Sequence, residues 1–193
     1  MKPFLAPAAA IALLGASAAV AEPVVYDFDP SHSQVVFDYR HMGFSTSTGI
    51  INGITGKLVL DAQDPAKSSV EATIPLSGLR TVSEQLDEHL FGPDFFDTDA
   101  SGAVATFKST QVVPEDDDEA KVTGDLTLNG VTKQVVLDVD LNQIAAHPMT
   151  GKEAAGFDAE AEIRRSEFNL GKFAPAVADE VEIKITVEAV KAE

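Results

Sequence analysis

The stretch that most constrains the fold is residues 122–141, where two alternating runs of apolar and polar residues meet at Asn129-Gly130. Asn-Gly between such runs predicts a β-hairpin, because a type I′ turn needs positive φ at both central residues. One face of this hairpin is mostly apolar and the other is polar, interrupted only by Val136. This pattern is typical of an antiparallel sheet with one dry face. A two-residue turn also sets the register, which pairs Leu128 with Val131, Leu126 with Lys133, Gly124 with Val135 and Val122 with Leu137.

Further alternating runs predict that the rest of the chain is also built from strands. They lie at residues 26–30, 34–41, 49–60, 69–76, 103–109, 156–163 and 181–189. An exposed sheet edge invites aggregation, and closing the sheet removes that edge. About eight antiparallel strands close into a barrel that holds side chains or one slim ligand. We therefore predict an all-β fold, an antiparallel eight-stranded barrel with one short helix inserted.

The inserted helix is predicted at residues 83–90, where the spacing becomes helical. Val82, Leu86 and Leu90 fall on a common face, and a Phe95-Phe96 pair follows in a short turn. Because this segment interrupts a chain of strands, we expect the helix and its aromatic turn to cover or plug one end of the barrel.

Residues 1–21 have the pattern of a cleaved signal peptide. Lys2 is followed by an apolar, Ala-rich run, and Ala19-Val20-Ala21 matches the small-x-small cleavage pattern. A membrane anchor is the alternative, but the run is short and Ala-rich for a span of about 20 apolar residues. We expect residues 22–193 to form a single exported, periplasmic domain.

Composition excludes several classes of function. The chain has no Cys, which rules out disulfides, thiolate nucleophiles and cysteine-zinc sites. Asp and Glu number 31 against 14 Lys and Arg, a net charge of −17, so a nucleic-acid partner is not expected. The acidic run at residues 115–119 lacks the ligand spacing of an EF-hand loop, and we interpret it as a solvated hairpin loop.

The residue types of catalytic and metal sites are present, but their spacing does not favour such sites. Asp29, His32 and Ser33 contain the ingredients of a hydrolase triad, yet they are crowded into one turn with no nucleophile elbow. The histidines at positions 32, 41, 89 and 147 include no pair at i and i+4. We therefore predict no catalytic residues, no metal and no catalytic cofactor.

Two polar residues share the predicted inner face of the barrel. His41 follows Phe37 and Tyr39 inward, either as the polar end of an apolar channel or as a rim histidine facing water. Arg165 follows Ile163 inward near the barrel mouth. A guanidinium there would hold an anionic or carbonyl head group, or pair with a buried acidic residue.

Small residues are frequent on the predicted inner face. They either leave space for a ligand or complement large neighbours in a packed core, and composition does not decide between the two. The set is Ala72, Ala105, Gly124, Ala159, Ala161 and Ala189.

Four motifs in order resemble the YceI-like family of exported bacterial proteins, and together they span almost all of residues 22–193. They are residues 29–33 (DPSHS) with 41–44 (HMGF), 87–90 (DEHL) with 93–97 (PDFFD), 124–133 (GDLTLNGVTK), and 165–168 (RSEF) with 170–172 and 179–181. The chain departs from the family at three places, which alter packing and tunnel shape. Tyr26 replaces a usual Trp, Ile54 replaces a common Phe, and Ser101-Gly102-Ala103 replaces a Tyr-Pro pair.

The resemblance implies a lipocalin-like barrel, often dimeric, that holds a long isoprenoid chain such as a polyprenyl quinone or polyprenyl phosphate and performs no catalysis. The predicted function is thus periplasmic lipid binding, for transport, storage or sequestration. The predicted ligand-binding residues are Phe37, Tyr39, His41, Ile54, Leu58, Ala72, Ile74, Phe107, Leu126, Val135, Leu137, Phe157, Ala161, Ile163, Arg165 and Ile183.

Three alternatives stay open. The same tube would serve a carrier of fatty acids or fatty amides. A filled barrel would serve as an interaction or stress-response module, beside a membrane redox protein. An enzyme would need a cofactor or catalytic pair that the sequence does not offer.

Overall fold

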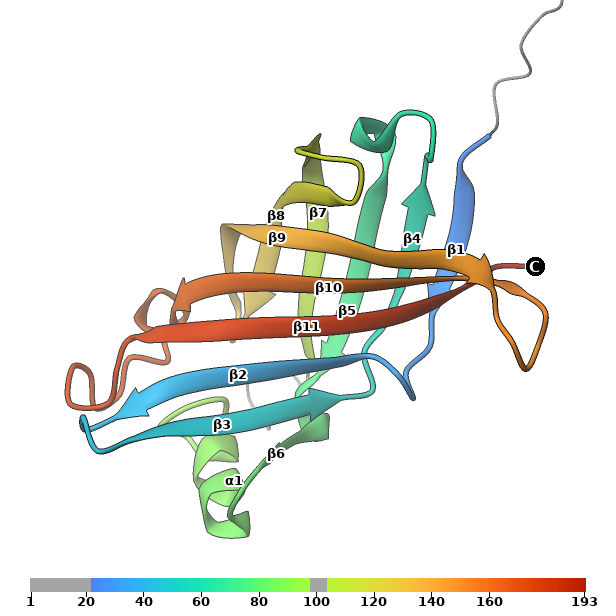
Figure 1. The fold of residues 1–193 in the computed structure, drawn as a ribbon. Helices are drawn as coiled ribbons and strands as arrows, with labels where there is room; N and C mark the ends of the chain where they lie inside the picture. Colours follow the sequence, from blue (N-terminus) through green and yellow to red (C-terminus); the bar gives the residue numbers. More distant parts are fainter. Residues whose placement is uncertain (1–21, 98–103) are drawn as a thin grey trace, which may run out of the picture.

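The computed structural model describes residues 22–97 and 104–193 (Figure 1). The predicted signal peptide and the Ser101-Gly102-Ala103 departure lie outside these residues. In the described part, no helix has the length and apolarity to cross a membrane. The strands are β1 (Val24–Phe28), β2 (Gln34–His41), β3 (Ser45–Asn52), β4 (Thr55–Leu60), β5 (Ser69–Pro75), β6 (Leu79–Thr81), β7 (Val104–Pro114), β8 (Glu119–Leu128), β9 (Val131–Ala146), β10 (Glu153–Arg164) and β11 (Glu180–Lys191), and the α-helix is α1 (Glu84–Phe91).

The sheet closes on itself, which confirms the predicted eight-stranded antiparallel barrel. The ring runs β1-β4-β5-β7-β8-β9-β10-β11 and returns to β1. β2, β3 and β6 continue outward from β11. In Figure 1, β9, β10, β11, β2 and β3 run across the front, while β7, β5, β4 and β1 stand upright behind them. The barrel interior lies between these two layers.

The turn at residues 29–33 lets two short strands share one long neighbour. β1 pairs with the last residues of β11, and β2 pairs with an earlier part of the same strand. Between them, the Asp29 backbone N–H (2.8 Å) and the Ser33 hydroxyl (3.3 Å) both donate to the carbonyl of Glu188. Ser33 is 3% exposed. The turn therefore bends the N-terminal strand without breaking its attachment to β11.

The strand predicted at residues 49–60 is in fact two strands, and that prediction was wrong. β3 ends at Asn52 and β4 begins at Thr55, with a corner at Gly53-Ile54. Gly53 has φ +78°, which an L side chain rarely adopts. Ile54 is buried at 2% exposure. β3 also begins at Ser45, four residues before the start of the predicted strand.

The β8–β9 hairpin has the predicted register. All four predicted pairs are present, from Leu128–Val131 to Val122–Leu137. Asn129 and Gly130 have φ of 49° and 74°, as a type I′ turn requires. Val136, the apolar residue on the polar face, is 47% exposed.

The predicted helix is present as α1, but its attachment differs from the prediction. Val82 precedes the helix and is 96% exposed, so it does not share the buried face of Leu90. The carboxylate of buried Asp87 accepts hydrogen bonds from the backbone N–H (2.7 Å) and the hydroxyl (2.6 Å) of Thr81. This side chain fixes the helix to β6, a contact that periodicity does not indicate.

Gly49 of β3 is paired with Phe37 of β2, and the phenyl ring lies over the glycine. A Cβ at position 49 would overlap this ring. We predict that Gly49→Ala lowers the free energy of unfolding by about 2 kcal/mol, because the ring must move. Gly156→Ala is the control, since its nearest neighbour would be Asn142 Cβ at 3.9 Å. Urea denaturation measures both variants, and equal stabilities would contradict the prediction.

Tyr26 of β1 couples barrel closure to pH. Its ring is 2% exposed and its hydroxyl donates to Glu153 Oε1 at 2.8 Å. Burial, followed by the hydrogen bond to Glu153 and its charge, raises the pKa of Tyr26 to about 12 from 10.0. The neutral phenol is favoured in the folded state, so its stabilisation is complete below pH 10.0 and is lost as pH rises toward about 12.

We predict that the free energy of unfolding of the wild-type protein falls by about 2 kcal/mol relative to that of Tyr26→Phe between pH 10.0 and about pH 12. At neutral pH, Tyr26→Phe costs about 1 kcal/mol, because the hydrogen bond to Glu153 is lost. Urea denaturation of both proteins at several pH values measures the difference. A difference that does not change with alkaline pH would contradict the coupling.

Candidate ligand-binding site

The barrel encloses an elongated cavity of about 800 Å³ between its two layers. Inward residues from every strand of the ring line it, and α1 contributes Leu86, His89 and Leu90. All of the residues predicted for ligand binding line this cavity: Phe37, Tyr39, His41, Ile54, Leu58, Ala72, Ile74, Phe107, Leu126, Val135, Leu137, Phe157, Ala161, Ile163, Arg165 and Ile183.

The small inward residues divide between the two interpretations left open by the sequence. Ala72, Ala105, Ala159 and Ala161 line the cavity, so their size leaves space. Gly124 is covered by the ring of Phe107, and Ala189 is completely buried in a second apolar cluster with Tyr26 and Val187. The barrel interior is therefore open beside the alanines of β5, β7 and β10, and it is packed at the β1 end, where Tyr26 and Ala189 lie.

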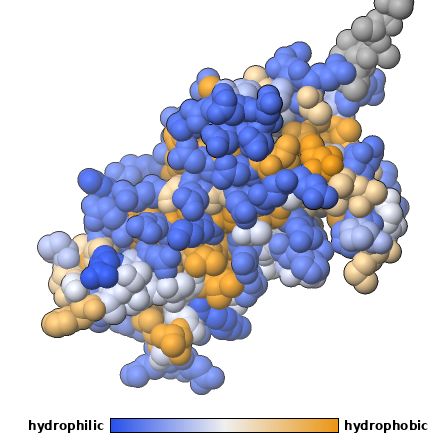
Figure 2. All heavy atoms as spheres, viewed as in Figure 1, coloured by the Kyte–Doolittle hydropathy of each residue, from blue (hydrophilic) through white to orange (hydrophobic). Residues whose placement is uncertain are grey.

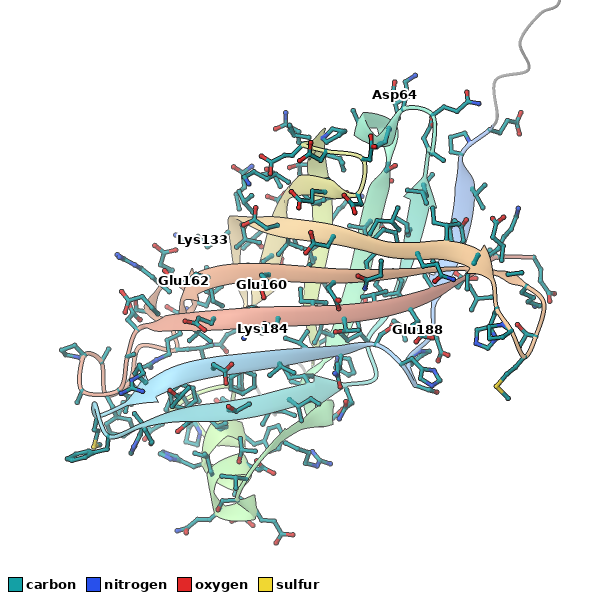
Figure 3. All side chains as sticks on the ribbon, viewed as in Figure 1. Asp64, Lys133, Glu160, Glu162, Lys184 and Glu188 are labelled. Carbon is teal, nitrogen blue, oxygen red and sulfur yellow. The ribbon has the colours of Figure 1, made fainter. Side chains whose placement is uncertain are left out.

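The outer face of the same strands is charged. Figure 3 shows Glu160, Glu162, Lys184 and Glu188 projecting outward from β10 and β11, and Figure 2 shows this surface as mostly hydrophilic. Because successive residues of a strand alternate between faces, this leaves the apolar residues for the cavity wall. The wall is thus apolar along its length, and its polar groups are concentrated at the two ends.

An aromatic cluster lies at the α1 end of the cavity. The His89 ring lies edge-on to Phe95 (5.2 Å between centroids), and both rings contact Phe173 (6.0 and 6.2 Å). His89 Nε2 is also 3.8 Å from Asp94 Oδ2. These contacts confirm the prediction that the helix and its aromatic turn cover one end of the barrel. Phe173 was not among the residues predicted for ligand binding, because it lies in a loop without periodicity.

Arg165 lies at the same end and is 7% exposed. Its guanidinium donates to backbone carbonyls: Nε to Ala178 (2.8 Å), Nη2 to Val177 (2.8 Å), and Nη1 to Lys172 (2.8 Å) and Leu170. Burial lowers the pKa of Arg165 from its ordinary value. These hydrogen bonds from Arg165 hold the segment after β10 in its path. The predicted buried partner, an acidic side chain, is replaced by these backbone groups.

His41 lies where β2 reaches the cavity opening. It is half-buried, lines the cavity and forms an isolated backbone bridge with Val177. Both sequence interpretations describe part of this position, since the residue belongs to the channel and to the rim.

The opposite end of the cavity is acidic. Asp116, Asp117, Asp118 and Glu119 of the β7–β8 turn are exposed, as predicted for a solvated loop, but they also line the cavity. The Leu141 backbone N–H donates to the carbonyl of Asp118 at 2.7 Å, which fixes the turn against β9. The two ends of the cavity therefore differ in charge.

The Asp29–His32–Ser33 turn lies outside the cavity lining. His32 Nδ1 lies 2.8 Å from Asp29 Oδ2, while Ser33 donates to the Glu188 carbonyl instead of to His32. The hydrogen bond between His32 and Asp29 raises the pKa of the histidine and lowers that of the carboxyl. Asp29, His32 and Glu188 have ligand atoms within 4.8 Å of one another. The contacts of the turn are those of a structural corner.

We predict that Arg165→Lys lowers the free energy of unfolding by about 2–3 kcal/mol, because an ammonium cannot replace four fork-shaped donors to buried carbonyls. Arg164→Lys is the matched control. Arg164 is exposed, 3.6 Å from Glu180, and its replacement should cost less than about 0.5 kcal/mol. Chemical denaturation measures both variants. Equal losses would show that the carbonyl contacts of Arg165 contribute little.

Solved structures share this architecture. A crystal structure of BcnA from Burkholderia cenocepacia superposes with a TM-score of 0.74 at 27% identity, covering 83% of this chain and 98% of that one. The YceI protein of Campylobacter jejuni gives a TM-score of 0.70 at 27% identity, covering 80% and 90%. A polyisoprenoid-binding domain from Saccharophagus degradans gives 0.69 at 13% identity, covering 88% and 99%, and shows likeness of fold alone.

Sequence comparison agrees with the fold. Protein YceI of Escherichia coli O157:H7 is 37% identical over 179 residues, which are 93% of this chain and 92% of that protein. The model of the YceI-like domain matches residues 26–189. The match includes most or all of every strand of the closed ring, and the chain belongs to the YceI-like family.

Proposed function

We propose that this protein is a periplasmic lipid-binding protein that holds a long isoprenoid chain in its barrel for transport, storage or sequestration. The observation that carries the proposal is the continuous apolar wall of the 800 Å³ cavity. Each CH₂ moved from water into such a wall contributes about 0.8 kcal/mol, so a long hydrocarbon chain needs few polar contacts. The Saccharophagus domain described as polyisoprenoid-binding has the same fold and supports this choice of ligand.

A neutral head group fits the polar residues better than a phosphate. Among the described residues that line the cavity, Arg165 is the one Lys or Arg. Its guanidinium already donates to four carbonyls, so little of it is free for an anion. The aromatic cluster of His89, Phe95 and Phe173 offers ring faces and edges to a flat head group. We therefore favour a polyprenyl quinone over a polyprenyl phosphate.

Export of the protein is part of the same proposal. The signal-peptide pattern of residues 1–21 supports a periplasmic location. A homodimer and a membrane redox protein as partner stay predictions from the sequence and the family resemblance.

Substitutions that fill the cavity test the proposal. Ala72 of β5 and Ala161 of β10 line the cavity from its rear and front layers. We predict that Ala72→Phe and Ala161→Phe each weaken the binding of a polyprenyl quinone by about tenfold or more, because the added ring occupies the space of the chain. Titration of delipidated protein, with bound ligand counted by native mass spectrometry, measures the affinity.

Ala146→Phe at the exposed end of β9 is the matched control, because it adds the same ring outside the cavity lining. It should keep the wild-type affinity. Unchanged affinity in both cavity variants would contradict the assignment of the site. Displacement of the quinone by a long-chain fatty acid at equal concentration would favour the fatty-acid carrier instead.

A further inference from the structure

One end of the barrel exposes large apolar side chains around the cavity opening. Phe44 is 91% exposed, Met42 52% and Phe173 46%. Single exposed apolar side chains are ordinary, but these three lie on two segments that are in backbone contact, and such a group marks an interaction surface. We call residues 39–47 and 168–178, which carry these side chains, the mouth. In Figure 2, pale orange atoms lie at the lower left, where the β2–β3 hairpin ends.

Backbone contacts hold the two segments of the mouth side by side. The Met42 N–H donates to the carbonyl of Ala176 (3.0 Å), and the Ala178 N–H donates to the carbonyl of Arg40 (2.9 Å). Met42 and Phe173 also line the cavity. The exposed apolar surface of the mouth is therefore continuous with the cavity wall.

The mouth carries two cationic side chains. Its two segments contain Arg40 and Lys172 and no Asp or Glu, while Asp38, Glu167 and Asp179 lie directly beside them in the sequence. Arg40 donates to neutral groups, Thr46 Oγ1 (2.9 Å) and the Gly43 carbonyl (3.2 Å). Lys172 Nζ is 3.1 Å from Asp94 Oδ1, outside the mouth, and 5.6 Å from the centroid of Phe173. The charge of Lys172 is thus shared with Asp94, whereas the hydrogen bonds of Arg40 go to neutral groups.

The backbone conformation at Met42 also indicates that this side chain has a role at the surface. Met42 has φ +51°, a conformation that Gly or Asn adopts more easily than a long side chain. The turn nevertheless places a flexible apolar side chain there, where it reaches both the cavity and the solvent. A role at the surface explains an apolar residue in this position better than turn formation does.

We propose that the mouth docks on an anionic phospholipid membrane. Phe44, Met42 and Phe173 enter the interfacial region, while Arg40 and Lys172 contact the anionic head groups. The cavity then opens toward the bilayer. Exchange of an isoprenoid through this opening rests on the proposed function, but the docking itself needs no isoprenoid.

Vesicle co-sedimentation tests the docking. The probe is phosphatidylcholine vesicles with about one-third phosphatidylglycerol and no isoprenoid, and every protein carries the same N-terminus. We expect Phe44→Ser to weaken partitioning about tenfold, because a phenyl ring leaves the interface. We expect Lys172→Glu to weaken it about fivefold or more. Vesicles of phosphatidylcholine alone should bind the wild-type protein more weakly.

Two matched controls lie in the β9–β10 turn, at the opposite end of β10. Met149 is 89% exposed, so Met149→Ser removes an equally exposed apolar side chain. Lys152→Glu loses one ion pair, with Glu193 at 2.8 Å, as Lys172→Glu loses its pair with Asp94. Both controls should bind vesicles as the wild-type protein does. The proposal would be overturned if the wild-type protein did not bind the anionic vesicles. It would also be overturned if Met149→Ser weakened vesicle binding as much as Phe44→Ser does.

Two further measurements distinguish membrane docking from self-association and from isoprenoid binding. Light scattering reports self-association: a dimer that Phe44→Ser dissociates, with vesicle binding unchanged, would assign the mouth to a second copy and overturn the proposal. Isoprenoid binding in detergent is measured in parallel. Phe44→Ser should keep the wild-type affinity for the isoprenoid, while its binding to vesicles is weakened. A wild-type protein that binds vesicles but no isoprenoid would support docking and contradict the proposed function alone.

Discussion

The structure depends on the attachment of β11 to three other strands. β10 pairs along one edge of β11, while β2 and β1 follow each other along the other edge. Pairing with β1 closes the ring, so the apolar faces of its eight strands turn inward and the ring itself has no open edge, while β2, β3 and β6 extend from β11. The Asp29–Ser33 turn makes this possible, because the Glu188 carbonyl receives two hydrogen bonds where the pairing changes from β1 to β2. A family motif that contains residue types of a hydrolase triad thus serves as a corner.

Alternation and turn chemistry predicted much of this fold. Two-residue periodicity fixes which side chains face inward, so the apolar cavity lining followed from the pattern once closure was assumed. The Asn129-Gly130 turn fixed the hairpin register because positive φ at both positions admits few alternatives. The division into two strands at Gly53-Ile54 was missed, and the inward side changes parity there, because Ile51 of β3 and Ile54 both line the cavity. Arg165 was placed at the correct end, but its four carbonyl partners come from residues 170–178, whose irregular path no local pattern encodes.

The cavity also shows how a closed barrel remains hollow. Flat phenyl rings over glycines, as with Phe37 on Gly49 and Phe107 on Gly124, lie against the wall instead of filling the centre. Alanines on β5, β7 and β10 leave further space. At the β1 end, in contrast, Tyr26 and Ala189 are packed at 2% and 0% exposure. The two ends of the cavity also differ, since one has an acidic loop and the other has an aromatic cluster and the buried Arg165. A lipid with distinct ends would be oriented by this difference.

The lipid that the protein carries when purified from its own cells distinguishes an isoprenoid carrier from a filled barrel. Native mass spectrometry of that protein, followed by solvent extraction and chromatography, gives the mass of any bound molecule. We expect a single polyprenyl lipid, with a quinone head group, at about one molecule per barrel. Protein that carries no lipid and also refuses added isoprenoids would contradict this expectation, and the barrel would then be an interaction module.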